Sequence, residues 1–197
     1  MDFRSSAELS TKQGCSSLLL LALAVLLLRG GERVGLLGSN GRILKGIGAL
    51  PEMVEILTSN LDQPHPGGLP EKRKVSRGSQ VVFISDFLEP LSLLEERIRW
   101  YSGQGQRGLL LQVLDPAEMT LPYSGRARFR GLEGEEETVI GQVEKVRADY
   151  GKRMLRHIDG LSEMAHRLGW SFVSHKTDKP PQTALLALYL ALSQEFD

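Results

Sequence analysis

An uninterrupted apolar run from Leu18 to Leu28 limits what this chain can fold into more than any other feature. As a helix, its eleven residues span about 16 Å, whereas the hydrocarbon core of a bilayer is about 30 Å thick. The segment before the run carries acidic as well as basic residues, and no small-x-small cleavage site follows, so it does not resemble a signal peptide. A helix that is apolar on every side and ends at Gly30-Gly31 is typical of a core helix buried against a sheet. Membrane attachment through this run is the alternative.

Continuous apolar segments alternate with segments of helical periodicity along the chain. Buried strands are predicted over residues 80–84, 109–114 and 170–173. A first helix, capped by Ser10 or Thr11, runs to about residue 29, and further helices are predicted over 52–61, 91–101, 143–168 and 180–192. This alternation favours an α/β fold with a mainly parallel sheet.

Two hairpins and one long loop complete the predicted organisation. Ser39-Asn40-Gly41 is a strong turn signal between strands at 33–38 and 42–47, which predicts one antiparallel hairpin near the start of the chain. A second hairpin is predicted at 127–140. Residues 62–79 form a loop rich in proline, glycine and basic residues, and we expect it to be solvated because no aromatic residues interleave the charges. No internal repeat is visible, so residues 1–197 are expected to form a single domain.

Composition narrows the classes of function. The chain has 24 basic and 24 acidic residues, so no overall basic field favours nucleic acid or an anionic membrane. Its single cysteine, Cys15, cannot form an internal disulfide, which suits the reducing cytoplasm. The four histidines are scattered and show no zinc-ligand spacing.

Polar residues follow each of the three predicted buried strands: Ser85-Asp86, Asp115 and Ser174-His175. In an open parallel sheet, ligands bind in the crevice at the carboxyl ends of the strands. Asp86 and Asp115 also each begin a capping-box pattern, with Glu89 and Glu118 three residues later. The proline after Asp115 favours the cap there. For Asp86, a cap and a ligand-facing carboxylate both stay open.

Sequence motifs give little support for an enzyme. The chain contains no GxxxxGK[ST] phosphate loop, no GxSxG elbow and no GxGxxG motif after a strand. The remaining enzymatic alternative is a small α/β enzyme that uses Asp86 and Asp115 as paired carboxylates at the carboxyl edge of the sheet. Two carboxylates that point into one concave pocket would favour this alternative, whereas two helix caps would disfavour it.

Several segments together resemble one bacterial family, the domain of unknown function 58. The resemblance covers essentially the whole chain. It is carried by MDFRSS, by TK with the apolar helix that ends in RGGERVGLL, by VVFISDFLEP, VLDPAEMTLPYSGRARFRGLEGEE and VRADYGKRMLRHIDGL, and by a TD followed by the final ALLALYLAL helix. Members of this family look like von Willebrand factor type A domains. The resemblance therefore implies a Rossmann-like sheet, mainly parallel with one antiparallel edge hairpin.

The resemblance also implies a metal-ion-dependent adhesion site. Such a site holds Mg²⁺ through an Asp-x-Ser-x-Ser loop after the first strand, a threonine from a second loop and an aspartate after a later strand. Asp86 occupies the position of this last aspartate, which supports the ion mostly through water. Hard oxygen ligands with one open position suit Mg²⁺ and leave room for a carboxylate of the partner.

The chain departs from the family pattern in ways that affect this site. Met-Asp-Phe comes directly after the metal loop in the family, so the first central strand and three ligating side chains would lie upstream of Met1. The threonine loop would fall at Pro66-Gly67-Gly68-Leu69, where no threonine stands. We therefore expect an incomplete metal site, with Asp86 as its one residual position and no cofactor in this chain.

The function expected from the resemblance is that of a non-enzymatic protein-interaction module in the cytoplasm. The partner that the family suggests is a MoxR-class AAA ATPase. Neither nucleic acid nor a membrane span is expected.

Overall fold

The computed structural model describes residues 3–37, 42–61, 72–129 and 138–193. Its helices are α1 (Lys12–Arg29), the 3-10 helix η1 (Ile47–Ala49), α2 (Leu50–Leu61), α3 (Leu91–Ser102), α4 (Pro116–Thr120), α5 (Val143–Arg167) and α6 (Pro181–Ser193). Its strands are β1 (Arg33–Gly35), β2 (Ile43–Lys45), β3 (Gln80–Ser85), β4 (Arg107–Leu114), β5 (Ala127–Phe129), β6 (Thr138–Ile140) and β7 (Ser171–Lys176). Every helix and strand that the sequence predicts is found, with ends shifted by a few residues at most.

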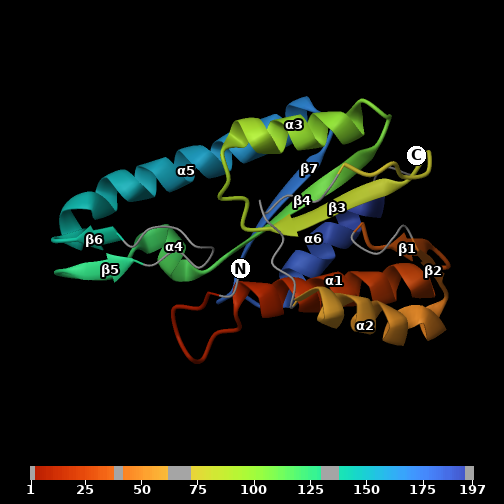
Figure 1. Cartoon of the computed structure of the whole chain (residues 1–197), viewed down its shortest axis with the longest axis horizontal. Helices are drawn as coiled ribbons and strands as arrows, with labels where there is room; N and C mark the ends of the chain where they lie inside the picture. Colours follow the sequence, from red (N-terminus) through yellow and green to blue (C-terminus); the bar gives the residue numbers. More distant parts are fainter. Residues whose placement is uncertain (1–2, 38–41, 62–71, 130–137, 194–197) are drawn as a thin grey trace.

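A parallel three-stranded sheet with the order β3-β4-β7 forms the centre of the molecule (Figure 1). The central strand β4 is buried from Gly108 to Leu114, because it has a hydrogen-bonded neighbour on each side and helices over both faces. Such continuous apolar strands are typical of parallel sheets. The protein therefore has a mixed α/β fold, as predicted.

Side chains alternate between two cores along β3. Val81 and Phe83 pack with α3 and α5 on one face, in a core that also contains Trp170. The Phe83 and Trp170 rings are stacked, with their centroids 5.6 Å apart. Val82 and Ile84 pack with α1 and α6 on the other face. The sheet is thus the middle layer of three (Figure 1).

Helix α1 carries the apolar run, but it is not buried on every side. One stripe, including Cys15, Leu19 and Leu23, packs on the sheet as predicted, while Leu18 and Leu26 are exposed. By length and composition alone, this 18-residue helix would be able to cross a membrane, and core helices of soluble proteins pass the same test. The prediction of a core helix is therefore confirmed for one face only.

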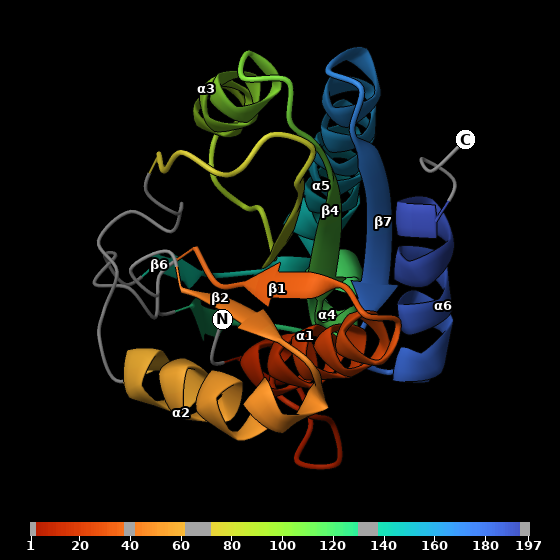
Figure 2. The same cartoon turned by 90° about the vertical axis from the view of Figure 1, so that its right-hand side faces the viewer.

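The hairpin of β1 and β2 is separate from the parallel sheet. Its two strands pair antiparallel, and Figure 2 shows it beside α1 and α2, crossing the direction of β4 and β7. The predicted antiparallel hairpin is therefore found, and in the described residues it is not joined to the parallel sheet, because β1 and β3 are not hydrogen-bonded to each other. Its turn at Ser39-Asn40-Gly41 and the predicted loop at Pro66–Leu69 lie outside the described residues.

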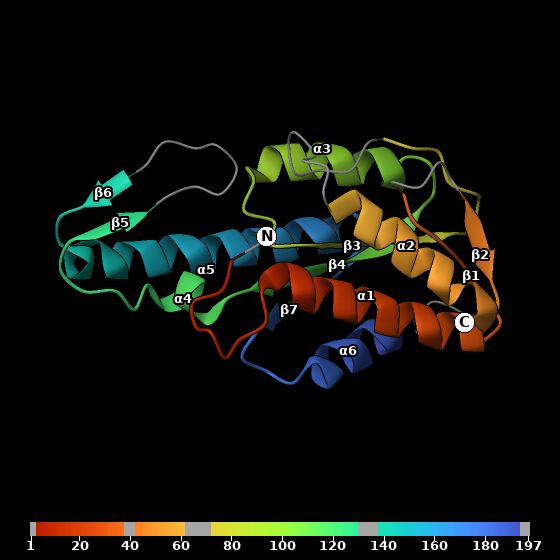
Figure 3. The ribbon, with the colours of Figure 1, turned by 60° about the horizontal axis from the view of Figure 1, so that its bottom comes forward.

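The amino-terminal half of α5 extends beyond the sheet (Figure 3). Helix α4 and the β5–β6 hairpin lie alongside this half. Arg147 of α5 ties the chain after α4 to the helix, since its guanidinium donates to the carbonyl oxygens of Leu121 at 3.0 Å and Tyr123 at 2.7 Å. This arrangement places α4, the ends of β3 and β4, and α5 around one edge of the sheet.

Candidate functional site at the carboxyl edge

Four charged side chains meet where β3 and β4 end, and we call them the carboxyl-edge cluster: Lys12, Asp86, Asp115 and Glu118. Asp86 follows β3 directly, Asp115 follows β4, and Glu118 stands on α4. Lys12 is the first residue of α1, whose amino end reaches the same edge. Parallel strands bring their carboxyl ends to one edge, which explains why residues distant in sequence converge here.

Asp115 caps α4, as its sequence context predicts. One of its carboxylate oxygens accepts from the backbone N–H of Ala117 at 2.8 Å, and Glu118 accepts from the backbone N–H of Asp115 at 2.9 Å. The other carboxylate oxygen accepts from the backbone N–H of Ser5 at 2.8 Å. The side chain is fully buried, so both oxygens have replaced water with protein donors.

Asp86 does not cap the helix that follows it. Helix α3 begins at Leu91 with Pro90 as its N-cap, five residues after Asp86. A residue before proline is disfavoured in the helical region, so the helix cannot begin at Phe87 as a capping box would require. Phe87 itself has a positive φ of 49°. Of the two alternatives left open for Asp86, the helix cap is therefore excluded.

The carboxylate of Asp86 instead binds Lys12. The Lys12 ammonium nitrogen lies 2.7 Å from Asp86 Oδ2 and 2.5 Å from Glu118 Oε1. Only 3% of Lys12 is exposed. Burial by itself lowers the pKa of the ammonium, but the hydrogen bonds and charges of Asp86 and Glu118 outweigh it, so the pKa of Lys12 is raised. Lys12 therefore carries its charge at neutral pH.

Sequence patterns did not identify Lys12 as a member of the site. Its partners stand 74 and 106 residues away, so no local spacing links them. The available signal was indirect: Lys12 begins a helix whose apolar run packs on the sheet, so its charge needs a partner where that end of the helix is buried.

Polar side chains from the sheet support the cluster. Gln112 of β4 is fully buried, and its side-chain amide donates to the Asp86 carbonyl oxygen at 3.0 Å. The hydroxyl of Ser174 donates to the Gln112 side-chain oxygen at 3.2 Å. The third predicted strand end therefore reaches the site through Ser174. His175 is buried next to it, and burial lowers its pKa.

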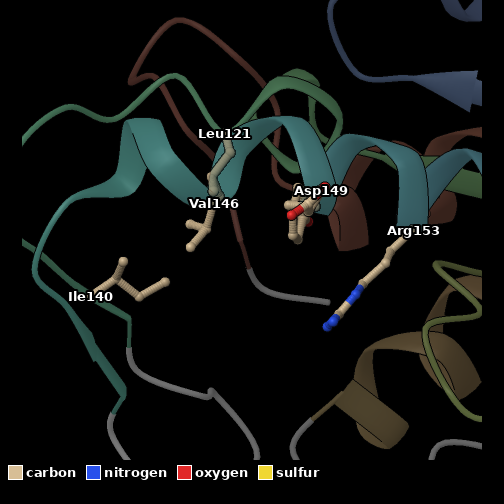
Figure 4. A pocket seen from close by; sticks show the side chains of 6 residues that line it. Leu121, Ile140, Val146, Asp149 and Arg153 are labelled. Carbon is tan, nitrogen blue, oxygen red and sulfur yellow. The ribbon is translucent and has the colours of Figure 1, made fainter.

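Two adjoining cavities form what we call the α5 groove, and neither is lined by Asp86 or Asp115. The larger, of about 540 Å³, is lined by Leu121, Ile140, Val146, Asp149, Tyr150 and Arg153. The smaller, of about 320 Å³, is lined by Leu88, Tyr150, Arg153, Met154 and His157. In Figure 4, Val146, Asp149 and Arg153 extend from one side of α5 toward the space near Ile140.

The groove is joined to the carboxyl edge by the loop after β3. His157 Nε2 of α5 lies 2.6 Å from the carbonyl oxygen of Phe87 and donates to it. Leu88, the next residue of that loop, lines the smaller cavity. The groove and the carboxyl-edge cluster are therefore neighbouring parts of one surface, connected through residues 86–88.

The described residues do not fit the Mg²⁺ ion that the resemblance implies at Asp86. The Lys12 ammonium already lies 2.7 Å from that carboxylate. A divalent ion about 4 Å from the ammonium would be repelled by about 8 kcal/mol at an effective dielectric constant of 20. Among the residues that the structure describes, no group of three or more His, Cys, Asp or Glu residues is placed to hold a metal ion.

Comparison with known proteins places most of the chain in one family. A family model described as a protein of unknown function, DUF58, matches residues 1–159. No curated protein and no solved structure matches the chain. The matched range includes all of the carboxyl-edge cluster and all residues that line the α5 groove.

Proposed function

The chain belongs to the DUF58 family of proteins of unknown function, and from this premise we propose that it is a protein-interaction module of the von Willebrand factor A-like type. Its partner is a MoxR-class AAA ATPase, as the family resemblance suggests, and the two meet in the cytoplasm. Recovery of the chain in a carbonate-resistant membrane fraction would contradict this location.

The layered fold supports the A-like type. Helices cover both faces of a parallel sheet, and polar residues follow all three strands at one edge. In an A-type sheet a further strand separates the counterparts of β1 and β3, which agrees with the lack of pairing between these two strands.

The chemistry of the strand ends supports binding over catalysis. Asp115 is buried as a helix cap, and Asp86 is engaged by a buried ammonium. The two carboxylates line neither cavity of the α5 groove. Paired catalytic carboxylates need access to a substrate in a shared pocket, so this geometry disfavours the alternative of a small α/β enzyme.

The α5 groove is the observation that carries the proposal. Its walls are mostly apolar, contributed by Leu121, Ile140, Val146 and Leu88. Arg153 lies in both cavities and is exposed, with no ion-pair partner among the described residues. The Asp149 carboxylate also lines the larger cavity and lies 3.9 Å from the Lys152 ammonium. A mostly apolar wall with a guanidinium that has no ion-pair partner among the described residues suits a partner segment that presents an apolar side chain next to a carboxylate.

A charge reversal in the groove tests the proposal. We expect Arg153→Glu to weaken binding of the purified ATPase at least about tenfold, since a carboxylate would then face the partner's carboxylate. Arg156→Glu is the matched control, because Arg156 is also an exposed arginine of α5 but lines neither cavity. Affinity is measured by surface plasmon resonance with the immobilised chain.

The possible outcomes test the identity of the partner and the location of its binding site separately. Failure of the ATPase to bind the unaltered chain would contradict the partner assignment. An equal loss of ATPase affinity in the Arg153→Glu and Arg156→Glu variants would indicate a general effect of charge and would contradict recognition through the groove.

A further inference from the structure

Lys12 stands where two local rules disfavour a lysine. It is the first residue of α1, after the cap Thr11, where the partial positive charge of the helix end disfavours a cation. It is also almost completely buried. The first turn of α1 contains no acidic residue, so the compensating charges come from outside the helix. A residue that violates local preference in this way has its explanation in the tertiary structure.

The surroundings of the ammonium are those of an enclosed cation. Two carboxylate oxygens, from Asp86 and Glu118, lie within 2.7 Å of its nitrogen. The ring of Phe3 covers it from another direction, with the ring centroid 6.0 Å from the nitrogen. The backbone N–H of Lys12 donates to the Phe3 carbonyl oxygen at 3.1 Å, which joins the main chain of Phe3 to the start of α1.

We infer that Lys12 is the resident cation of the carboxyl edge: its ammonium takes the position that a divalent ion would need between Asp86 and Glu118, and thereby excludes that ion. The remaining carboxylate of the cluster, Asp115, is satisfied by backbone N–H groups and needs no ion. The charges of this edge are therefore balanced without Mg²⁺. The inference concerns the charge balance of the edge and does not depend on the proposed ATPase.

Replacing the ammonium is expected to create a weak ion site. Mg²⁺ and Mn²⁺ are commonly held by one or two carboxylates together with water. The two oxygens that now contact the lysine nitrogen come from different segments, Asp86 after β3 and Glu118 in α4, and already face one point. Lys12→Met keeps the apolar length of the side chain and removes only the charge.

The unaltered chain gives the first test. Calorimetric titration with Mg²⁺ and with Mn²⁺ is expected to show no saturable binding up to about 1 mM free ion, the weak limit for carboxylate sites. Saturable binding of either ion that is abolished by Asp86→Asn would overturn the inference. This arm requires no lysine variant to fold.

Thermal unfolding of variants gives the second test. We expect about 1 mM Mn²⁺ to raise the Tm of Lys12→Met by about 3 °C or more, the shift for an ion at roughly ten times its Kd in a chain of this length. The Tm of the unaltered chain is expected not to move. The double variant Lys12→Met/Asp86→Asn is expected to lose the response.

A matched lysine elsewhere controls for loss of one positive charge. Lys72 pairs with Glu96 at 2.6 Å on the surface, so Lys72→Met removes an exposed ion pair of the same chemistry. We expect its Tm to be unaffected by Mn²⁺. A Lys12→Met variant that does not respond to Mn²⁺, or responds no more than Lys72→Met does, would show that the ammonium does not occupy an ion position.

Discussion

A single buried lysine holds together groups that the sequence separates widely. The ammonium of Lys12 joins the end of β3, through Asp86, to helix α4, through Glu118. Glu118 in turn completes the capping box of Asp115. Removing one partner of a buried ion pair is far more costly than removing an exposed one, because the other charge stays desolvated. Much of the stability of this edge therefore depends on one residue.

Lys12→Met is expected to lower the free energy of unfolding by about 3–5 kcal/mol near neutral pH. Because the pKa of Lys12 is raised in the folded protein, its contribution is complete below its unfolded value of about 10.4 and is lost as pH rises through the folded pKa. The difference between the variant and the unaltered chain should therefore shrink in strongly alkaline buffer. Urea unfolding at two pH values measures it, and a difference independent of pH would contradict the assignment.

The role of a single residue could be predicted where its hydrogen-bond partners lie close to it in the sequence. The Asp115-Pro116-Ala117-Glu118 spacing identifies a cap because both hydrogen bonds of a capping box close within four residues. The same pattern failed at Asp86, where Pro90 delays the helix. Lys12 could not be assigned, because its partners are set by the fold and not by neighbouring residues.

At the scale of elements, close packing of β4 depends on a position without a side chain. Gly108 of β4 pairs with Val81 of β3. A Cβ at Gly108 would lie 2.0 Å from the Val81 carbonyl oxygen and 2.8 Å from the Trp170 ring. Neither contact leaves room for a methyl group, so the glycine allows the strand and the ring to approach each other.

Gly108→Ala is accordingly expected to destabilise the protein by about 3 kcal/mol, at the upper end of the cost of overpacking. Gly151→Ala is the matched control: Gly151 lies in the interior of α5 with nothing within 4 Å of an added Cβ, so alanine should stabilise by about 0.5–1 kcal/mol. Urea unfolding followed by tryptophan fluorescence measures both. Similar stability of the two variants would contradict the described packing around Trp170.

The sequence predicted the type and order of the helices and strands accurately. It predicted less well which strands are neighbours. Apolar runs identified β3, β4 and β7 because a strand covered on both faces is apolar throughout. Alternation cannot show which strand lies beside which. The β1–β2 hairpin was thus predicted correctly as a hairpin, whereas its position beside the parallel sheet comes only from the structure.

At the scale of the whole molecule, the candidate binding surface lies beside the sheet and along α5. The α5 groove combines residues from β6, α5, the loop after β3 and the C-cap of α4, Leu121. The groove exists because α5 extends beyond the sheet. The hydrophobic periodicity of the sequence predicts this helix but not where it lies relative to the sheet. The sequence therefore predicted the carboxyl edge through its polar strand ends but could not predict the groove next to it.

Hydrogen–deuterium exchange of the chain with and without the purified MoxR-class ATPase tests the central claim most directly, since it locates the partner without any substitution. ATPase binding is expected to slow amide exchange by about tenfold or more in residues 146–157 and around Leu88, and to leave exchange in the β1–β2 hairpin unchanged. Protection confined to the hairpin, or no protection under conditions where the complex forms, would contradict recognition at the α5 groove.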